Sequence, residues 1–215
     1  MRAAGYLRAF ALGLPVTLLL VACSRGSATP NLSPVSSAPP SSASSVSVSA
    51  SPSTSAAYPA DVPLTGHNVR PGERPPVYPA AAKAHTQDGA NAFAEFFMRT
   101  LDWAYATTNP SYAQHFSGTT CGLCNGLAVG IHKTAARHLW YEGGRFTIHT
   151  AIATPIAPVT APADFCSLIQ VDVTAESVVD KTGKIYTGDG AHSNLQFKLC
   201  ARQTASWMTT YLARV

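Results

Sequence analysis

Apolar side chains follow a helical period in two segments in the middle of the chain. From residue 86 to Tyr105 they recur every three or four residues, and Thr86 or Asp88 provides a cap at which a helix can begin. From about Cys124 to Trp140 they are spaced four apart, and a glycine pair at 143–144 ends the pattern. The sequence therefore predicts two amphipathic helices in this region.

The period changes to alternation after residue 145. Phe146, Ile148 and Ile152 alternate with Thr147 and His149. Apolar and polar residues also alternate in 169–176 and 195–202, and a last strand is predicted at 206–215. Each segment has one apolar and one polar face, which is typical of an antiparallel sheet covered on one side. Helices followed by strands indicate an α+β fold, with N-terminal helices packed on one face of a curved antiparallel sheet of about four strands.

The first 22 residues have the pattern of a secretory signal peptide. Two arginines and no acid precede the apolar segment 9–20, which is too short to span a bilayer and is interrupted by Pro15. Leu20-Val21-Ala22-Cys23 resembles the lipobox of bacterial lipoproteins, in which the cysteine becomes the first residue and carries acyl chains. The resemblance implies lipidation of Cys23 and a protein held at the extracytoplasmic side of the cell membrane.

A segment of low complexity follows the signal. Residues 24–63 contain 14 Ser, 7 Pro and 7 Ala, so 28 of these 40 residues are of three types. Such a composition buries too little apolar surface to offset the conformational entropy of the chain. We therefore divide the chain into a signal peptide (1–22), a lipidated cysteine with a disordered tether (23–78) and a single α+β domain (79–215).

The balance of charge excludes one class of partner. Only 12% of the residues are charged, and 15 Lys and Arg against 11 Asp and Glu give a formal net charge of +4. The basic residues form no run, so nucleic-acid binding has no electrostatic support.

Four cysteines remain when Cys23 is set aside. An even number in an oxidising compartment predicts two disulfides. The expected pairs are Cys121 with Cys124 and Cys166 with Cys200.

The second pair also predicts a strand register. If Cys166 faces Cys200 on neighbouring antiparallel strands, the same register places Gly183 in the middle of the connecting turn. The sequence Gly188-Asp189-Gly190 indicates a bulge or a second bend within this stretch.

Part of the domain resembles a known family. The residues that carry the resemblance are Gly89-Ala90, Ala92-Phe93, Phe96-Phe97, the run from Trp103 to Thr107, Ser117 and Cys121-Gly122-Leu123-Cys124. Over about residues 77–150 they resemble an uncharacterised family of actinobacterial surface lipoproteins with a domain of unknown function. The resemblance implies a cone similar to the nuclear transport factor 2-like fold, and it brings no catalytic assignment.

Cys121 and Cys124 form a C-x-x-C motif, which at a helix N-terminus supports thiol–disulfide exchange. Enzymes of the thioredoxin type place this motif after a buried strand, whereas a polar loop precedes it here, so a structural disulfide is favoured. The seven histidines contain no H-x-x-x-H or H-E-x-x-H pair. We therefore expect neither a metal site nor a cofactor.

A cone-shaped fold encloses a pocket between helices and sheet, and the side chains expected to line it are apolar. They are Phe93, Phe97, Leu101, Ile148, Ile152, Ile169, Val171, Phe197 and Leu199. Asp102 and Tyr105 lie three residues apart on one helix and offer an alternative, an isomerase-like acid–base pair. The favoured interpretation is that Asp102 is solvated and that Tyr105 lies at the rim of the core.

These observations favour a lipid-anchored binding or interaction module of the cell envelope over an enzyme. Besides the membrane, its expected partner is a small apolar ligand or an envelope protein. The alternatives are a pocket enzyme that uses Asp102 and Tyr105, and a thiol–disulfide oxidoreductase that uses Cys121 and Cys124. A fold shared with enzymes would not by itself decide between them.

Overall fold

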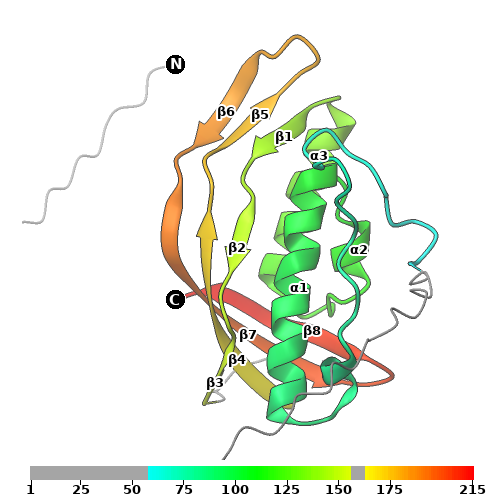
Figure 1. Ribbon diagram of the computed structural model, residues 1–215, viewed down its shortest axis with the longest axis vertical. Helices are drawn as coiled ribbons and strands as arrows, with labels where there is room; N and C mark the ends of the chain where they lie inside the picture. The colour runs from blue at the N-terminus through cyan, green and yellow to red at the C-terminus, as the bar shows by residue number, and fades with distance from the viewer. Residues whose placement is uncertain (1–57, 156–162) are drawn as a thin grey trace, which may run out of the picture. The chain divides into compact units, whose positions relative to one another are not determined.

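The computed structural model describes residues 58–155 and 163–215, so the expected signal peptide, Cys23 and the first part of the tether lie outside it. Four helical segments come first: η1 (Ala80–Lys83), α1 (Gln87–Thr107), α2 (Ser111–Gln114) and α3 (Gly122–Ala136). Eight strands follow: β1 (Trp140–Gly143), β2 (Phe146–Ile148), β3 (Ile152–Thr154), β4 (Phe165–Val173), β5 (Glu176–Val179), β6 (Ile185–Asp189), β7 (His192–Gln203) and β8 (Trp207–Arg214). Figure 1 shows this order of elements.

The long helix α1 begins and ends close to where the apolar period predicts. The Oγ1 atom of Thr86 accepts a hydrogen bond from the backbone N–H of Gly89 at 3.1 Å, so Thr86 is the cap. A Cβ atom at Gly89 would lie 2.0 Å from the carbonyl oxygen of Ala84, which explains a glycine in the first turn. The helix ends at Thr108, whose φ of 52° is left-handed.

Helix α3 differs from its predicted bounds at both ends. It begins at Gly122 because Cys121 is its cap, with the sulfur accepting from the backbone N–H of Cys124. It ends at Ala136, and His138 then takes a left-handed φ of 57° that turns the chain into β1. The predicted extension of this helix to Trp140 is therefore wrong, since Trp140 is the first residue of β1.

The strands form two antiparallel sheets, which corrects the expected single sheet of about four strands. One sheet has five strands, with β4 paired to β2 and β3 on one side and to β7 on the other, and β7 paired to β8. The other has three strands in the order β1-β5-β6. The two segments predicted at 146–152 and 169–176 are each divided, because the chain bends between β2 and β3 and between β4 and β5.

The two sheets meet at a bend without a change of register. Gly143 pairs with Glu176 in one sheet, and Phe146 pairs with Val173 in the other. Three steps along one strand therefore match three steps along the other across the bend. Hydrogen bonds from Gly144 N to the Ala175 carbonyl and from Thr174 N to the Arg145 carbonyl bridge the interval. Gly143 and Gly144 have positive φ values of 71° and 64°, which only glycine adopts readily. Figure 1 shows β5 and β6 extending from this bend as a hairpin.

The register predicted from the cysteines is confirmed. Cys166 pairs with Cys200 across β4 and β7, and Gly183 lies in the turn between β5 and β6 with a φ of 76°. The pairing of β4 with β7 shifts by one residue between Val171 and Val173, near the bulge or second bend expected at 188–190.

The core lies between α1 and the five-stranded sheet. Helix α1 packs against β2, β3, β4, β7 and β8, and Figure 1 shows the helices on one side of these strands. Phe93, Phe97, Trp103 and Trp207 are each at most 2% exposed. A core of this kind excludes water from the inner face of the sheet.

The folded part begins earlier than predicted, because residues 58–78 also pack on it. Val62 is 6% exposed, and the indole N–H of Trp103 donates to the carbonyl of Pro63. The Tyr58 hydroxyl donates to the carbonyl of Pro75. The prolines prevent regular strands here, yet a few large side chains anchor the segment, so the assignment of 58–78 to a disordered tether is corrected.

Candidate ligand-binding pocket

The interior that the sequence predicts as a pocket is filled by its own side chains. Phe93, Phe97 and Leu101 of α1 are at most 4% exposed and belong to the same packed cluster as residues of the sheet. The sheet residues of this cluster from the expected lining are Ile169, Val171 and Leu199. Ile152 is 57% exposed, so its expected place in the lining is wrong.

A cavity of about 240 Å³ lies instead at the bend between the two sheets. We call it the bend pocket. Its apolar part consists of Phe146, Val173, Leu195 and Phe197. Its polar part consists of Tyr105, Thr174, Glu176, Asp189, His192 and Arg214, with Gly190 beside them. An apolar surface with a few convergent polar groups is the usual composition of a small-molecule site.

The local structure explains how these residues come together. Phe146, Val173 and Phe197 lie on β2, β4 and β7, at positions whose side chains share the face covered by α1. Tyr105 reaches the same place from the last turn of α1, with its ring 5.9 Å from that of Phe146. The cavity thus lies where the ladder bends between the two sheets.

Glu176 is the first residue of β5 and lies half-buried in the bend pocket. Burial raises the pKa of its carboxyl, and the nearby charge of Asp189 raises it further. A Cβ atom at Gly144 would lie 2.7 Å from Oε2 of Glu176, so the glycine makes room for this carboxylate. Among the described residues, Glu176 has no hydrogen-bond or ion-pair partner for its side chain.

The other charged groups of the pocket have partners or are exposed. His192 Nε2 lies 2.9 Å from Oδ2 of Asp189, and this contact lowers the pKa of the Asp189 carboxyl. Arg214, at the end of β8, is exposed at the rim. Burial raises the pKa of the Tyr105 hydroxyl, so this group stays protonated at neutral pH.

Asp102 is neither solvated nor an acid–base partner of Tyr105. Its carboxylate accepts two hydrogen bonds from Arg145, at 2.9 and 2.8 Å, and a third from the backbone N–H of Phe146. Arg145 is 7% exposed, and its remaining donors go to Glu73 and to the Asn68 carbonyl. The carboxylate therefore holds α1 to β2 and to the segment before η1, and the geometry removes it from any pocket chemistry.

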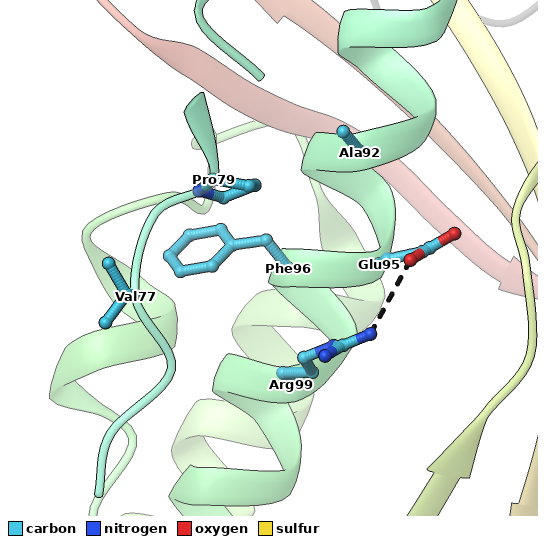
Figure 2. Close-up of a pocket in the computed structure, with 6 residues that line it drawn as sticks. All are labelled: Val77, Pro79, Ala92, Glu95, Phe96 and Arg99. Atoms are coloured by element: carbon cyan, nitrogen blue, oxygen red, sulfur yellow. Dashed lines mark ion pairs between the residues drawn. The ribbon is translucent and has the colours of Figure 1, made fainter. Parts of the chain in front are cut away.

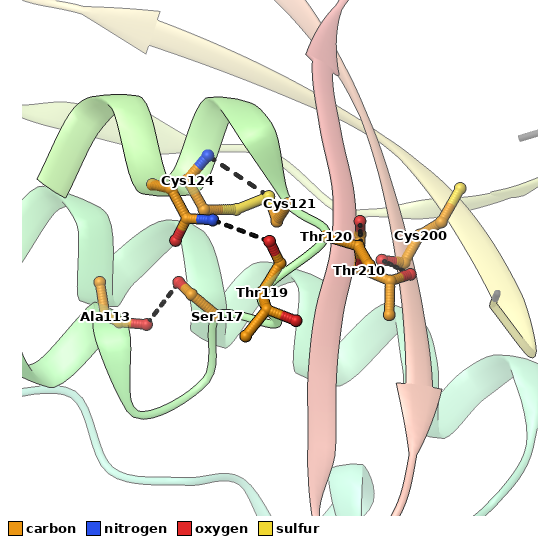
Figure 3. The surroundings of a disulfide bond; sticks show 9 residues. Ala113, Ser117, Thr119, Thr120, Cys121, Cys124, Cys200 and Thr210 are labelled. Carbon is orange, nitrogen blue, oxygen red and sulfur yellow. Dashed lines mark hydrogen bonds between the residues drawn. A yellow bond between two sulfur atoms is a disulfide. The ribbon is translucent and has the colours of Figure 1, made fainter. Parts of the chain in front are cut away.

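The four cysteines of the domain lie at disulfide distance as Cys121–Cys124 and Cys166–Cys200. Cys121 is fully buried and Cys124 is 2% exposed, so neither is accessible to a substrate disulfide. Figure 3 shows the first pair at the start of α3, beside the loop that Thr120 ties to β8 by donating to the Thr210 carbonyl. This environment is that of a structural disulfide.

The histidines serve local contacts. Four of them lie within 3.0 Å of an aspartate, in the pairs His85–Asp164, His115–Asp61, His149–Asp172 and His192–Asp189. Within residues 58–155 and 163–215, no three His, Cys, Asp or Glu side chains are grouped as ligands of a metal ion would be.

Two further hollows flank the segment that crosses α1 near Val77. The one in Figure 2 has a volume of about 160 Å³, and its charged residues are Glu95 and Arg99. These two side chains pair with each other at 3.6 Å, and Glu95 also accepts from the Ala151 N–H.

The neighbouring hollow, of about 330 Å³, is mostly aromatic. The hydroxyls of its three tyrosines, Tyr58, Tyr78 and Tyr112, each donate to a backbone carbonyl. Of these three hollows, we therefore take the bend pocket, which contains an unpaired carboxylate, as the candidate site.

The fold and the pocket together define a disulfide-bonded, mixed α/β domain with antiparallel sheets and a small-molecule-sized cavity. Residues 67–211 match a family described as a family of unknown function (DUF6318). Because the match spans more than half of the 215 residues, the chain belongs to this family. The resemblance to an uncharacterised family rested on about residues 77–150. The family match extends past this range and includes the strands that follow it.

No curated protein matches the chain. Among solved structures, it is similar to the intermembrane space region of the chloroplast protein ARC6, with 10% identity and a TM-score of 0.40. The similarity covers 61% of this chain and 98% of that one. A similarity at this level carries no argument about function.

In the described ranges, no helix is both long enough and apolar enough to cross a membrane. Two disulfides indicate an extracytoplasmic compartment, because the cytosol keeps thiols reduced.

Sequence reasoning found Tyr105 and Phe197 but missed Glu176, His192 and Arg214. The glycines at 143–144 and 188–190 were the signal that could have located the bend. They mark where the chain departs from a regular strand, but they do not show that the two departures meet beside the end of α1.

Proposed function

We propose that this protein is a lipid-anchored binding module of the cell envelope whose bend pocket takes a small ligand. The observation that carries the proposal is the cavity itself, in which an apolar floor meets an unpaired carboxylate. Pockets of this composition, with one charged group left without an internal partner, are typical of ligand sites.

The expected location supports the same proposal. A signal peptide, an acylated Cys23 and a tether that ends near residue 57 would hold the domain outside the cytoplasmic membrane, where its disulfides persist. The expected likeness to actinobacterial lipoproteins and to the nuclear transport factor 2-like cone, with helices on one face of a curved sheet, is part of this proposal.

The anchor is tested by metabolic labelling with an alkynyl fatty acid. The wild-type chain should take up the label, and a Cys23→Ala chain should not. Label on the Cys23→Ala protein would place the anchor elsewhere.

The pocket is tested by native mass spectrometry of the full chain extracted from membranes in a mild detergent. We expect a reproducible added mass on the wild-type protein and its loss in Leu195→Trp, which fills the cavity. Ile185→Trp is the matched control, because Ile185 is 63% exposed on β6 and away from the pocket lining. A wild-type protein without added mass, or with the same added mass in Leu195→Trp, would contradict ligand binding at the bend.

A further inference from the structure

Glu176 differs from the other carboxylates of the protein in its interactions. All eleven Asp and Glu residues lie in the described ranges. Nine of them accept hydrogen bonds or form ion pairs: Asp61, Glu73, Glu95, Asp102, Glu142, Asp164, Asp172, Asp180 and Asp189. Asp88 has no partner but is exposed to water in the first turn of α1. Glu176 alone combines partial burial with the lack of a partner among these residues.

The position of Glu176 is built into the backbone. Gly144 lies against its carboxylate, and a side chain there would collide with Oε2. The adjacent carboxylate of Asp189 disfavours a negative charge at this point, yet the fold keeps both acids in one cavity. A half-buried carboxylate without a counter-ion is costly for the folded state, so a binding role is its natural explanation.

The walls around Glu176 favour a positive group. Tyr105, Phe146 and Phe197 contribute three aromatic rings to the same cavity. Aromatic faces attract cations, most strongly where water is excluded. The lining has two carboxylates, those of Glu176 and Asp189, and Asp189 is already paired with His192, so Glu176 is the carboxylate left for a cationic ligand.

We propose that the bend pocket binds a protonated organic amine, with Glu176 as counter-ion to the ammonium group and the aromatic rings around its apolar body. This inference rests on the proposed ligand-binding function and names the chemical class of the ligand. Arg214 is exposed and forms no ion pair with Glu176, so it does not compete with the ligand's ammonium group for this carboxylate.

Isothermal titration calorimetry on the detergent-extracted full chain tests the inference with two probes of one skeleton. 2-Phenylethylamine carries an ammonium group at neutral pH, and 2-phenylethanol carries a hydroxyl in its place. We expect the amine to bind at least about tenfold more tightly than the alcohol. Glu176→Gln should abolish this preference, and Glu142→Gln, which removes an exposed carboxylate from β1, should retain it.

Three results would overturn the inference: equal affinity for both probes, a preference that survives in Glu176→Gln, or no binding of either probe. Circular dichroism of the Glu176→Gln chain shows that it is folded. If the alcohol binds as well as the amine and both are lost in Leu195→Trp, the pocket binds ligands but not for their charge. The proposed function would then stand while the ammonium inference fails.

Discussion

Two charged side chains beside the glycine pair at 143–144 have opposite surroundings. Arg145 follows the pair directly, and the five hydrogen bonds of its side chain go to Asp102, Glu73 and the Asn68 carbonyl. Glu176 lies against Gly144 and has no such partner in the described structure. The first residue stabilises the junction between α1 and the sheet, whereas the second destabilises the folded state.

Glu176→Gln should therefore make the protein more stable at pH 7. Burial raises the pKa of Glu176 in the folded state, so the folded protein gains stability relative to the unfolded chain as pH falls through that raised value. Above that value the charged carboxylate lacks this gain, and the uncharged amide restores about 0.5–1 kcal/mol, a small figure because the site is partly solvated. Urea unfolding of the full chain at pH 7 measures the change.

The control for this measurement is Glu142→Gln, which should change the free energy of unfolding by no more than about 0.5 kcal/mol. A Glu176→Gln chain that is less stable than wild type would mean that the carboxylate has a stabilising partner.

Among the elements, those with one buried face could be predicted and those without could not. Helix α1 and strands β4, β7 and β8 each contribute residues to the packed core, so their apolar period is visible in the sequence. All five residues of β6 are exposed, so no pattern of burial marks it as a strand. The end of α3 was missed because the left-handed residue His138 turns the chain just before Leu139, which continues the four-residue apolar spacing of the helix.

The candidate site was predictable to a similar degree. Tyr105 and Phe197 belong to periodic elements and were placed near a cavity. Glu176 starts a strand beyond the bend, where the alternation of the preceding strand no longer indicates which way a side chain points. Asp102 was misjudged because its partner Arg145 is 43 residues away in sequence.

The two disulfides should stabilise their elements unequally. The Cys166–Cys200 bond closes a segment with a separation of 34 residues, and the Cys121–Cys124 bond one of 3. From loop entropy, replacing both cysteines of the long-range pair by alanine should cost about 4 kcal/mol, and replacing those of the short-range pair about 2 kcal/mol. Chemical denaturation of the two double variants compares them, and an equal or reversed cost would show that loop closure does not determine their contributions.

For the whole molecule, the loss of folding stability at low pH depends on several carboxylates. The hydrogen bond from Arg145 lowers the pKa of Glu73 from 4.5. Contacts with His115, Asn194 and His192 lower the pKa values of Asp61, Asp172 and Asp189 from 3.8. Their stabilisation is fully present above these ordinary values and is lost as pH falls through the lowered ones.

We therefore expect the melting temperature of the full chain to fall between pH 5 and pH 3. Differential scanning calorimetry across this range measures it. In Glu73→Gln the decline should be shallower, because one of the titrating groups is gone. A melting temperature that stays constant or rises toward pH 3 would contradict this account. It would mean that Glu176, whose protonation favours folding, dominates the pH dependence of the melting temperature.

The bond between Cys166 and Cys200 has a further consequence for a protein of an extracytoplasmic compartment. The exposed turn between β5 and β6 lies inside the ring that this bond closes. A protease that cuts the turn between Lys181 and Thr182 would produce two pieces still joined through sulfur. The C-terminal piece carries β7 and β8, and with them Phe197 and Arg214 of the bend pocket. A nicked molecule would therefore keep both walls of its pocket until a reductant released them.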